Sequence, residues 1–259
     1  MNSLVSVVNQ KVEILFIDGK SSDNTLEVIK KYNFFNSNVI SEDDKGVYDA
    51  MNKGVDLSKG EWLYFLGTDD RILADGFNKA VQMLDTIRCD IFYGNVTAEH
   101  IDGDYKDEFD FKRLLNQNIC HQGIFYRKSV FKNVGLYDLR YKYWADYEFN
   151  LRCFVKSTIS WLYIPLGIAY HAPGGLSSSI RRDDAFDNDL IKNINTAIEQ
   201  PFLIRVKMLY YLYAFCFENH GFFISAKRLK FCWAKNISAN VISFLLATLS
   251  HALNRLSRK

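Results

Sequence analysis

Residues 60–70 read GEWLYFLGTDD, and this stretch decides the fold class of the chain. Trp62–Leu66 is a short run of aromatic and aliphatic residues, and a glycine and polar residues ending at Asp69 and Asp70 follow it. An apolar run that stops at a glycine is typical of a buried strand that ends in a loop. Two adjacent carboxylates at a strand end repel one another, so a cation or hydrogen-bond donors are expected beside them.

Predicted strands and helices alternate on either side of this stretch. Further strands are expected at Val12–Ile17, Val39–Ile40 and Ile91–Tyr93, and helices at Thr25–Tyr32, Val47–Leu57, Phe77–Thr86, Ser129–Val134 and Tyr147–Phe154. This alternation predicts an α/β fold with a mostly parallel sheet flanked by helices. Ligands of such open sheets bind beyond the carboxyl ends of the strands, so the polar residues there are candidate site residues.

The composition of the 259-residue chain excludes several classes of protein. Apolar residues make up 48% and charged residues 24%, which excludes a disordered or fibrous chain. The net charge of +2 gives no reason to expect nucleic acid as a partner. The five cysteines include no C-x-x-C pair, so neither a zinc site nor a disulfide framework is expected. A reducing compartment is the simplest interpretation, and secretion is not expected from the first residues.

The last part of the chain differs from the rest in charge. Residues 201–259 hold nine Lys or Arg and one acidic residue, a formal charge of +8, whereas residues 1–200 sum to −6. This tail has two apolar runs, Leu209–Phe217 and Ile237–Leu253, and the second is short and polar for a membrane span. We expect one domain over 1–200 and a basic helical appendage over 201–259. The appendage either contacts an anionic membrane surface, which we favour, or caps the main domain.

Polar residues at the ends of two predicted strands each have a chemical and a structural interpretation. Asp18 and Asp23 flank a turn into a helix, where carboxylates bind a ribose or a base, or simply form the turn and cap the helix. Asp69 and Asp70 have the oxygen ligands that Mg²⁺ or Mn²⁺ prefers, or they form a solvated acidic loop.

Two further groups lie in the middle of the chain. Asp146 begins a predicted helix among aromatic residues, so it is a candidate general base or an ordinary helix cap. His121 and His171 are candidate metal or anion contacts, although a single histidine is more often structural. The sequences typical of P-loop proteins, α/β-hydrolases and HExxH metalloproteases do not occur.

Taken in order, these stretches resemble the bacterial family 2 glycosyltransferases of the GT-A fold. The resemblance is carried by FIDGKSSDNT (16–25), SEDDKGVYDAMNKG (41–54), GEWLYFLGTDD (60–70), HQGIFYR (121–127), GLYD (135–138), ADYEF (145–149) and GGLS (174–177). Each motif alone is weak, whereas seven in the family's order are specific. The resemblance implies an inverting transferase that moves a sugar from a nucleotide-sugar donor to a glycan or lipid-linked acceptor in cell-surface polysaccharide synthesis.

The resemblance also implies roles on the donor side. Asp18 and Asp23 match the residues that contact the donor nucleotide, and Asp44 and Lys45 match a motif that borders the same pocket. A divalent cation, Mg²⁺ or Mn²⁺, is expected to neutralise the leaving diphosphate.

The expected cation ligands come from two distant parts of the chain. Asp69 matches the family's aspartate that contacts the metal and the diphosphate, and Asp70 is its neighbour. His171 lies where some members place a late metal or phosphate contact.

The resemblance assigns the chemistry itself to Asp146, which matches the family's catalytic base for the acceptor hydroxyl. His121 and Gln122 are assigned to the acceptor side. Together with the basic tail, the resemblance implies a cytoplasmic enzyme at the inner face of the cell membrane, held there through residues 201–259.

Two features depart from the family pattern. Gly67 stands where many members have an acidic or amide residue, which leaves Asp69 and Asp70 to carry the metal site. Ser6–Gln10 matches the end of the family's first helix, so the central first strand, which forms one wall of the nucleotide pocket, is expected to be missing. These departures leave open a catalytically inactive GT-A-like binding or assembly subunit. A nucleotidyltransferase is a further alternative that lacks its Gly-rich phosphate loop.

Overall fold

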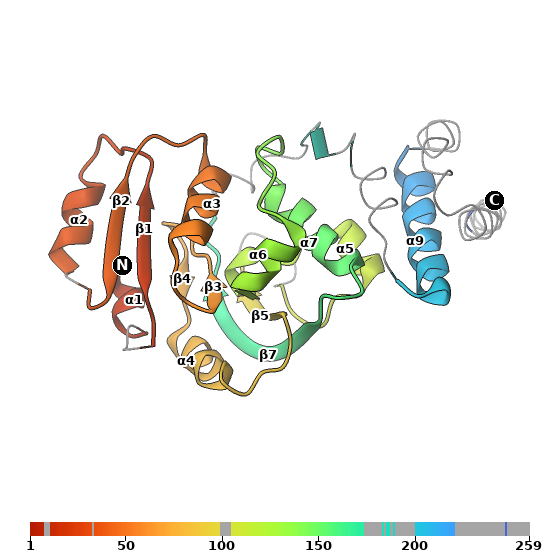
Figure 1. The fold of residues 1–259 in the computed structure, drawn as a ribbon, viewed down its shortest axis with the longest axis horizontal. Helices are drawn as coiled ribbons and strands as arrows, with labels where there is room; N and C mark the ends of the chain where they lie inside the picture. Colours follow the sequence, from red (N-terminus) through yellow and green to blue (C-terminus); the bar gives the residue numbers. More distant parts are fainter. Residues whose placement is uncertain are drawn as a thin grey trace. The chain divides into compact units, whose positions relative to one another are not determined.

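The computed structural model describes residues 1–7, 11–32, 34–98, 105–173, 183, 185–186, 189, 200–220 and 247. The chain falls into two compact units. The first unit comprises Met1–Glu108, Ile119–Phe149 and Ile159–Asp183, and the second comprises Phe109–Asn118, Asn150–Thr158 and Asp184–Lys259. Figure 1 shows the elements of both units coloured along the sequence. The predicted division at residue 200 stays a prediction.

The first unit begins with a short helix and a two-stranded parallel sheet. Helix α1 (Asn2–Val5) precedes strand β1 (Ile14–Asp18), and helix α2 (Thr25–Tyr32) connects β1 to strand β2 (Ser37–Ser41). The register pairs the first residues of the two strands and, at the other end, Asp18 with Ser41. The predicted strands and helix are confirmed here, and Figure 1 shows the two strands side by side.

A five-stranded sheet forms the larger part of the first unit. Its order is β3 (Trp62–Tyr64), β6 (Ile124–Arg127), β5 (Ile91–Thr97), β7 (Trp161–Tyr170) and β4 (Arg71–Ile72). Only β5 and β7 are parallel, and the other three pairs are antiparallel. The α/β class is confirmed, but the expectation of mostly parallel strands is wrong for this sheet. The sequence interpretation had not identified β4, β6 or β7, which supply the antiparallel partners.

Two consecutive aromatic residues of β6 pack on opposite faces of this sheet. Phe125 stacks on Phe92 with ring centroids 4.5 Å apart, and helix α4 (Ala74–Met83) adds Phe77 to this cluster. The next residue, Tyr126, contacts Phe131 and Phe149 on the other side, from helices α6 (Lys128–Val134) and α7 (Ala145–Val155). Successive side chains of a strand point to opposite faces, so one strand organises two cores.

The two sheets of the first unit are not joined by a ladder in the described part of the chain. There β1 pairs only with β2, and β3 pairs only with β6, so each has one edge without a backbone partner. The expected loss of a central strand would leave two such edges. Helix α3 (Val47–Leu57) leads from the small sheet to β3, and its predicted bounds are confirmed.

The second unit is helical in its described residues. Helix α5 (Phe111–Asn116) contacts helix α9 (Phe202–His220), which contains the predicted apolar run Leu209–Phe217. The buried residues of α9 are Met208, Leu209, Leu212, Tyr213 and Cys216. Its first turn instead exposes Phe202, Leu203 and Ile204. Among the residues that the structure describes, no helix is long and apolar enough to cross a membrane. Most of the second run, Ile237–Leu253, lies outside those residues.

Candidate active site

Asp18, the last residue of β1, is held by a hydroxyl group from the turn that follows β1 and by one from the end of β2. Its carboxylate accepts hydrogen bonds from Ser21 Oγ at 2.5 Å and from Ser41 Oγ at 2.6 Å. The hydrogen bonds from Ser21 and Ser41 outweigh desolvation and hold the pKa of Asp18 below its ordinary value. The carboxylate is therefore ionised and oriented at the end of the strand, where a ligand of an open sheet binds.

The other predicted donor-side residues lie in turns beside Asp18. Asp23 accepts a hydrogen bond from the Thr25 backbone N–H at 3.0 Å, and the side-chain hydrogen bond of Thr25, followed by this backbone contact, lowers the pKa of Asp23. The Asp44 carboxylate packs so closely on Gly19 that any side chain at position 19 would overlap it. The structure thus brings Asp18 and Asp44 to the same strand end, while the side chain of Lys45 is exposed there.

Asp70 is buried, with 6% of its surface exposed, and its carboxylate lies among three N–H donors. Gln122 Nε2 donates to Oδ2 at 2.5 Å, and both His171 Nδ1 and the Ala172 N–H donate to Oδ1 at 2.9 Å. Burial would raise the pKa of Asp70, but the hydrogen bonds from His171, Ala172 and Gln122 outweigh it and hold the pKa below its ordinary value. Asp70 therefore links the loop after β3 to the end of β7.

The replacement of an acidic residue by Gly67 has a local explanation in this arrangement. A Cβ atom at position 67 would lie 2.5 Å from Asp70 Oδ2. Real Cβ atoms do not approach an oxygen so closely, so a larger residue at this position would displace the Asp70 carboxylate from its partners. Gly67 and the inward position of Asp70 therefore depend on each other.

The predicted cation ligands do not form one cluster in this structure. The described residues include no group of three or more His, Cys, Asp or Glu side chains arranged to hold a metal ion. Both oxygens of Asp70 already accept N–H hydrogen bonds, so a cation bound there would share these oxygens with the Gln122, His171 and Ala172 donors. Asp69 is exposed, and its carboxylate oxygens are of the kind that divalent cations prefer as ligands. In His171 the contact with Asp70 uses Nδ1, so a cation would meet the ring at Nε2.

Asp146, in the first turn of α7, lies in a second buried polar cluster. The Tyr48 hydroxyl contacts Oδ1 at 2.7 Å, and His121 Nδ1 lies 3.4 Å from Oδ2. Burial would raise the pKa of Asp146, but the contacts with His121 and Tyr48 outweigh it and hold the pKa below its ordinary value. The carboxylate is therefore ionised at neutral pH, as a proton acceptor must be.

Two buried polar residues of α3 that were not among the predicted site residues contact Asp146 or the segment before it. Tyr48 contacts Asp146 directly, and Asn52, one turn further along α3, exchanges two hydrogen bonds with the backbone of Tyr137 at 2.9 and 3.0 Å. Residues four apart share one face of a helix. The spacing of these two buried polar residues within GVYDAMN was the available signal.

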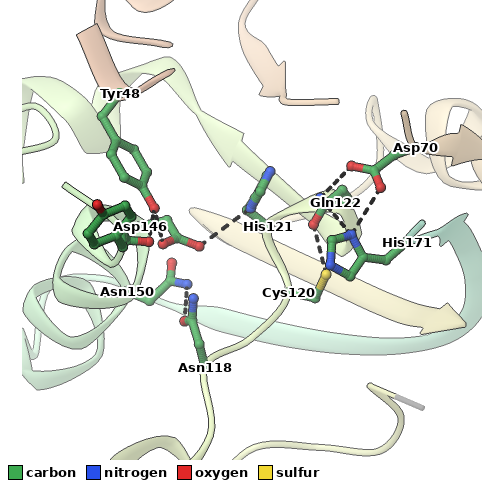
Figure 2. A network of polar contacts seen from close by, with 10 residues as sticks. Tyr48, Asp70, Asn118, Cys120, His121, Gln122, Asp146, Asn150 and His171 are labelled. Carbon is green, nitrogen blue, oxygen red and sulfur yellow. Dashed lines mark hydrogen bonds and ion pairs between the residues drawn. The ribbon is translucent and has the colours of Figure 1, made fainter. Parts of the chain in front are cut away.

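The two clusters meet at one turn of 3-10 helix, η1 (His121–Gly123). Figure 2 shows that its neighbouring side chains point to different carboxylates: His121 to Asp146, and Gln122 to Asp70. Gln122 is buried at 3% exposure and is part of the Asp70 cluster rather than an open acceptor surface. The predicted GGLS loop (174–177) lies outside the described residues.

Comparison with known proteins identifies the family. A sequence profile described as glycosyl transferase family 2 matches residues 2–135. A PGL/p-HBAD biosynthesis glycosyltransferase from Mycobacterium bovis (strain BCG) is 41% identical over 175 residues, which are 65% of this chain and 68% of that protein. The chain belongs to glycosyl transferase family 2. Another family 2 relative, an uncharacterized glycosyltransferase from Mycobacterium tuberculosis, is 29% identical over 157 residues, 55% of this chain and 57% of its own length.

Solved structures give the fold of this family 2 chain. A crystal structure of S. aureus TarS residues 1–349 matches with a TM-score of 0.65 at 15% identity, covering 95% of this chain and 75% of that one. The same TarS fragment in complex with UDP-GlcNAc matches with a TM-score of 0.64 at 16% identity, covering 92% and 76%. The expected GT-A-like fold is confirmed by this likeness. The profile match ends before Asp146 and His171, so the roles of those two residues rest on geometry and resemblance.

Proposed function

We propose that this family 2 glycosyltransferase transfers a sugar, with inversion, from a nucleotide-sugar donor to a glycan or lipid-linked acceptor of cell-surface polysaccharide. The observation that carries the proposal is Asp146: a buried, ionised carboxylate at a helix start, held by Tyr48 and near His121. A proton acceptor in such a position is what deprotonation of a sugar hydroxyl requires.

The proposed reaction uses Asp146 as the general base. The carboxylate takes the proton of the acceptor hydroxyl while that oxygen attacks the anomeric carbon of the donor. The bond from this carbon to the diphosphate oxygen breaks on the opposite face, so the configuration inverts and the nucleoside diphosphate leaves with the bonding electrons. His121, 3.4 Å from Asp146 Oδ2, lies where it can orient the acceptor hydroxyl.

The donor is proposed to bind at the carboxyl ends of β1 and β3. Asp18 and Asp23 would contact the nucleoside, and Asp44 and Lys45 would border it. The gathering of Asp18, Gly19 and Asp44 at one strand end supports this. Asp69, with His171 through Nε2, would hold Mg²⁺ or Mn²⁺, which when bound neutralises charge on the leaving diphosphate. Asp70 would orient His171 rather than bind the cation.

Contact with the inner face of the cell membrane is proposed for the second unit. The formal charge of +8 over residues 201–259 would attract anionic lipid, and Leu203, 80% exposed, and its neighbours Phe202 and Ile204 would enter the interface. We expect Leu203→Ser to weaken binding to anionic vesicles in a sedimentation assay. Leu139→Ser, at an exposed leucine of the first unit, is the matched control.

The alternative is a catalytically inactive GT-A-like subunit that binds a glycan or assembles with other proteins. The observation that favours it is the separation of the β1–β2 sheet from the five-stranded sheet, because the donor side then lacks a continuous sheet behind it. Such a subunit would release no nucleotide from any donor.

The test is nucleotide release from a panel of UDP-, GDP- and dTDP-sugars with Mn²⁺, with water or a lipid-linked glycan as acceptor. Asp146→Asn should slow release by about 10²–10⁴-fold while nucleotide binding persists, because a missing general base costs about that much. Asp85→Asn, an exposed carboxylate paired with Lys11, is the matched control and should keep the wild-type rate. Release from no donor, or undiminished release by Asp146→Asn, would contradict the proposal.

A further inference from the structure

The Tyr48 hydroxyl lies between two oxygen atoms and has one hydrogen to give. Its oxygen is 2.7 Å from Asp146 Oδ1 and 2.7 Å from the backbone carbonyl oxygen of Tyr143. The phenol of Tyr48 is buried, and burial and the neighbouring Asp146 charge raise the pKa of Tyr48 well above its ordinary value. The group is therefore a neutral hydroxyl donor near pH 7.

The geometry points to a role for Tyr48 that goes beyond the proposed reaction and rests on it. We propose that Tyr48 is the positioning residue of the general base: its O–H fixes Asp146 Oδ1, so that Oδ2, beside His121, faces the acceptor proton (Figure 2). A carboxylate that rotates about its terminal bond exchanges its two oxygens, and a displacement of the order of 1 Å at a reacting group can cost about 10²-fold in rate.

The position of Tyr48 is itself determined by packing. Its ring contacts that of Tyr137 with centroids 5.7 Å apart, and Asn52 binds the Tyr137 backbone from the same face of α3. Helix α3 therefore contacts the segment leading to Asp146 at two points. Tyr48 contacts the Asp146 carboxylate, whereas Asn52 contacts only the Tyr137 backbone. Variants of Tyr48 and Asn52 can therefore be compared with each other.

The other titratable groups around Asp146 come from three segments of the chain. His121 of η1 is the group nearest to Oδ2. Tyr147 of α7, Tyr105 and Cys120 all interact with the Asp146 charge, and burial, as the largest cause, raises the pKa of each of them. Glu148, in the same helix turn, is buried as well. Tyr147, Tyr105 and Cys120 are neutral near pH 7, so Tyr48 and His121 are the partners that stabilise the Asp146 carboxylate.

Removal of the hydroxyl in Tyr48→Phe takes away a donor to the ionised form of Asp146 and an acceptor for its protonated form. A hydrogen bond to a charged group is about twice as strong as a neutral one, so the first loss dominates and the pKa of Asp146 should rise by roughly one unit. A stronger base would by itself speed proton transfer only a few-fold. The lost orientation outweighs that gain, so we expect kcat to fall by about tenfold or more with an unchanged KM for the donor.

The experiment measures kcat, donor KM and thermal midpoint for wild type, Tyr48→Phe and Asn52→Ala, with the panel donor that the wild type turns over fastest. Asn52→Ala loosens the same helix contact without touching Asp146, so its midpoint should fall while kcat stays within about threefold. The carboxyl carbon-13 shift of Asp146, assigned by its loss in Asp146→Asn, gives the pKa without turnover. Its titration should move to higher pH in Tyr48→Phe alone.

Three outcomes decide the inference. A fall in kcat at constant KM together with the higher Asp146 titration in Tyr48→Phe supports it. A Tyr48→Phe variant with kcat within twofold of wild type overturns it, as does an equal loss of kcat in Tyr48→Phe and Asn52→Ala at equal loss of midpoint, which would mark a structural role. Undiminished turnover by Asp146→Asn would instead overturn the proposed function itself.

Discussion

Asp70 and Asp146 are both buried carboxylates with a pKa below the ordinary value, yet their surroundings differ in kind. Asp70 accepts hydrogen bonds from the Gln122 amide and, from a second segment, from the His171 imidazole and the Ala172 backbone N–H. Asp146 is held at Oδ1 by a hydroxyl that also has a carbonyl within reach, and at Oδ2 it faces a histidine. The first arrangement joins parts of the fold, whereas the second leaves one oxygen for the proton transfer that we propose.

The comparison also shows why sequence motifs assign roles imperfectly. Both residues lie in stretches that match the family, and the neighbouring acid Asp69 makes Asp70 resemble a metal ligand. The hydrogen bonds from Gln122 and His171 support instead the proposal that Asp70 orients His171. A carboxylate's role therefore depends on the donors around it more than on its place in a motif.

The largest expected difference between the two carboxylates is in stability. Asp70→Ala would leave the Gln122 amide, His171 Nδ1 and the Ala172 N–H without their acceptor, and should lower the free energy of unfolding by roughly 3 kcal/mol. Asp146→Ala should cost only about 1 kcal/mol, because the Tyr48 hydroxyl can turn to the Tyr143 carbonyl. Urea denaturation of both variants measures the free energy of unfolding. Equal decreases in the two variants would contradict the difference that we infer between Asp70 and Asp146.

Metal dependence separates Asp69 from Asp70. Asp69→Ala should weaken UDP binding measured with Mn²⁺ by about tenfold or more, because the proposed cation would lose a carboxylate ligand. Asp75→Ala, at an exposed acid in the first turn of α4, is the control and should bind UDP normally.

Asp70→Asn sharpens the same test, since it removes the charge but keeps the size of the side chain. We expect UDP binding by Asp70→Asn to respond to Mn²⁺ as the wild type does. A folded Asp70→Asn protein that no longer responds to Mn²⁺ would make Asp70 a ligand. Full activity of the wild type in EDTA would remove the metal from the mechanism.

The smallest expected effect concerns Asp18, whose hydroxyl partners lie near the surface. Its pKa is lowered in the folded protein, so its carboxylate favours folding above about pH 4, and that contribution is lost as the pH falls through the folded-state pKa. The thermal midpoint of Asp18→Asn should therefore decrease less between pH 5 and pH 3 than that of the wild type. If the thermal midpoint of Asp18→Asn fell with pH as that of the wild type does, Ser21 and Ser41 would not favour the ionised form of Asp18 over its protonated form.

Local sequence was sufficient to predict those helices and strands whose sequence pattern and end residues lie within one short stretch of the chain. The bounds of α2 and α3 were predicted to the residue, because each follows a turn of polar residues or glycine and carries apolar residues at helical spacing. The strands before Asp18 and Asp69 were predicted from short apolar runs that stop at a glycine. The order of the motifs was sufficient to predict the family and the GT-A-like fold.

Tertiary structure decided the strand directions and the roles of the site residues. Strand β7 contains Pro165 and Gly167, which weaken any strand signal, and its pairing with β5 and β4 makes it a strand. The partners of Asp70 lie 52 and 101 residues away, and Tyr48 lies 98 residues from Asp146. Such contacts have no local periodicity, because they arise only when packing brings distant strand ends and helix faces together. The sequence by itself therefore determined which chemical groups the site contains, and the fold decided which carboxylate is enclosed and which is oriented to react.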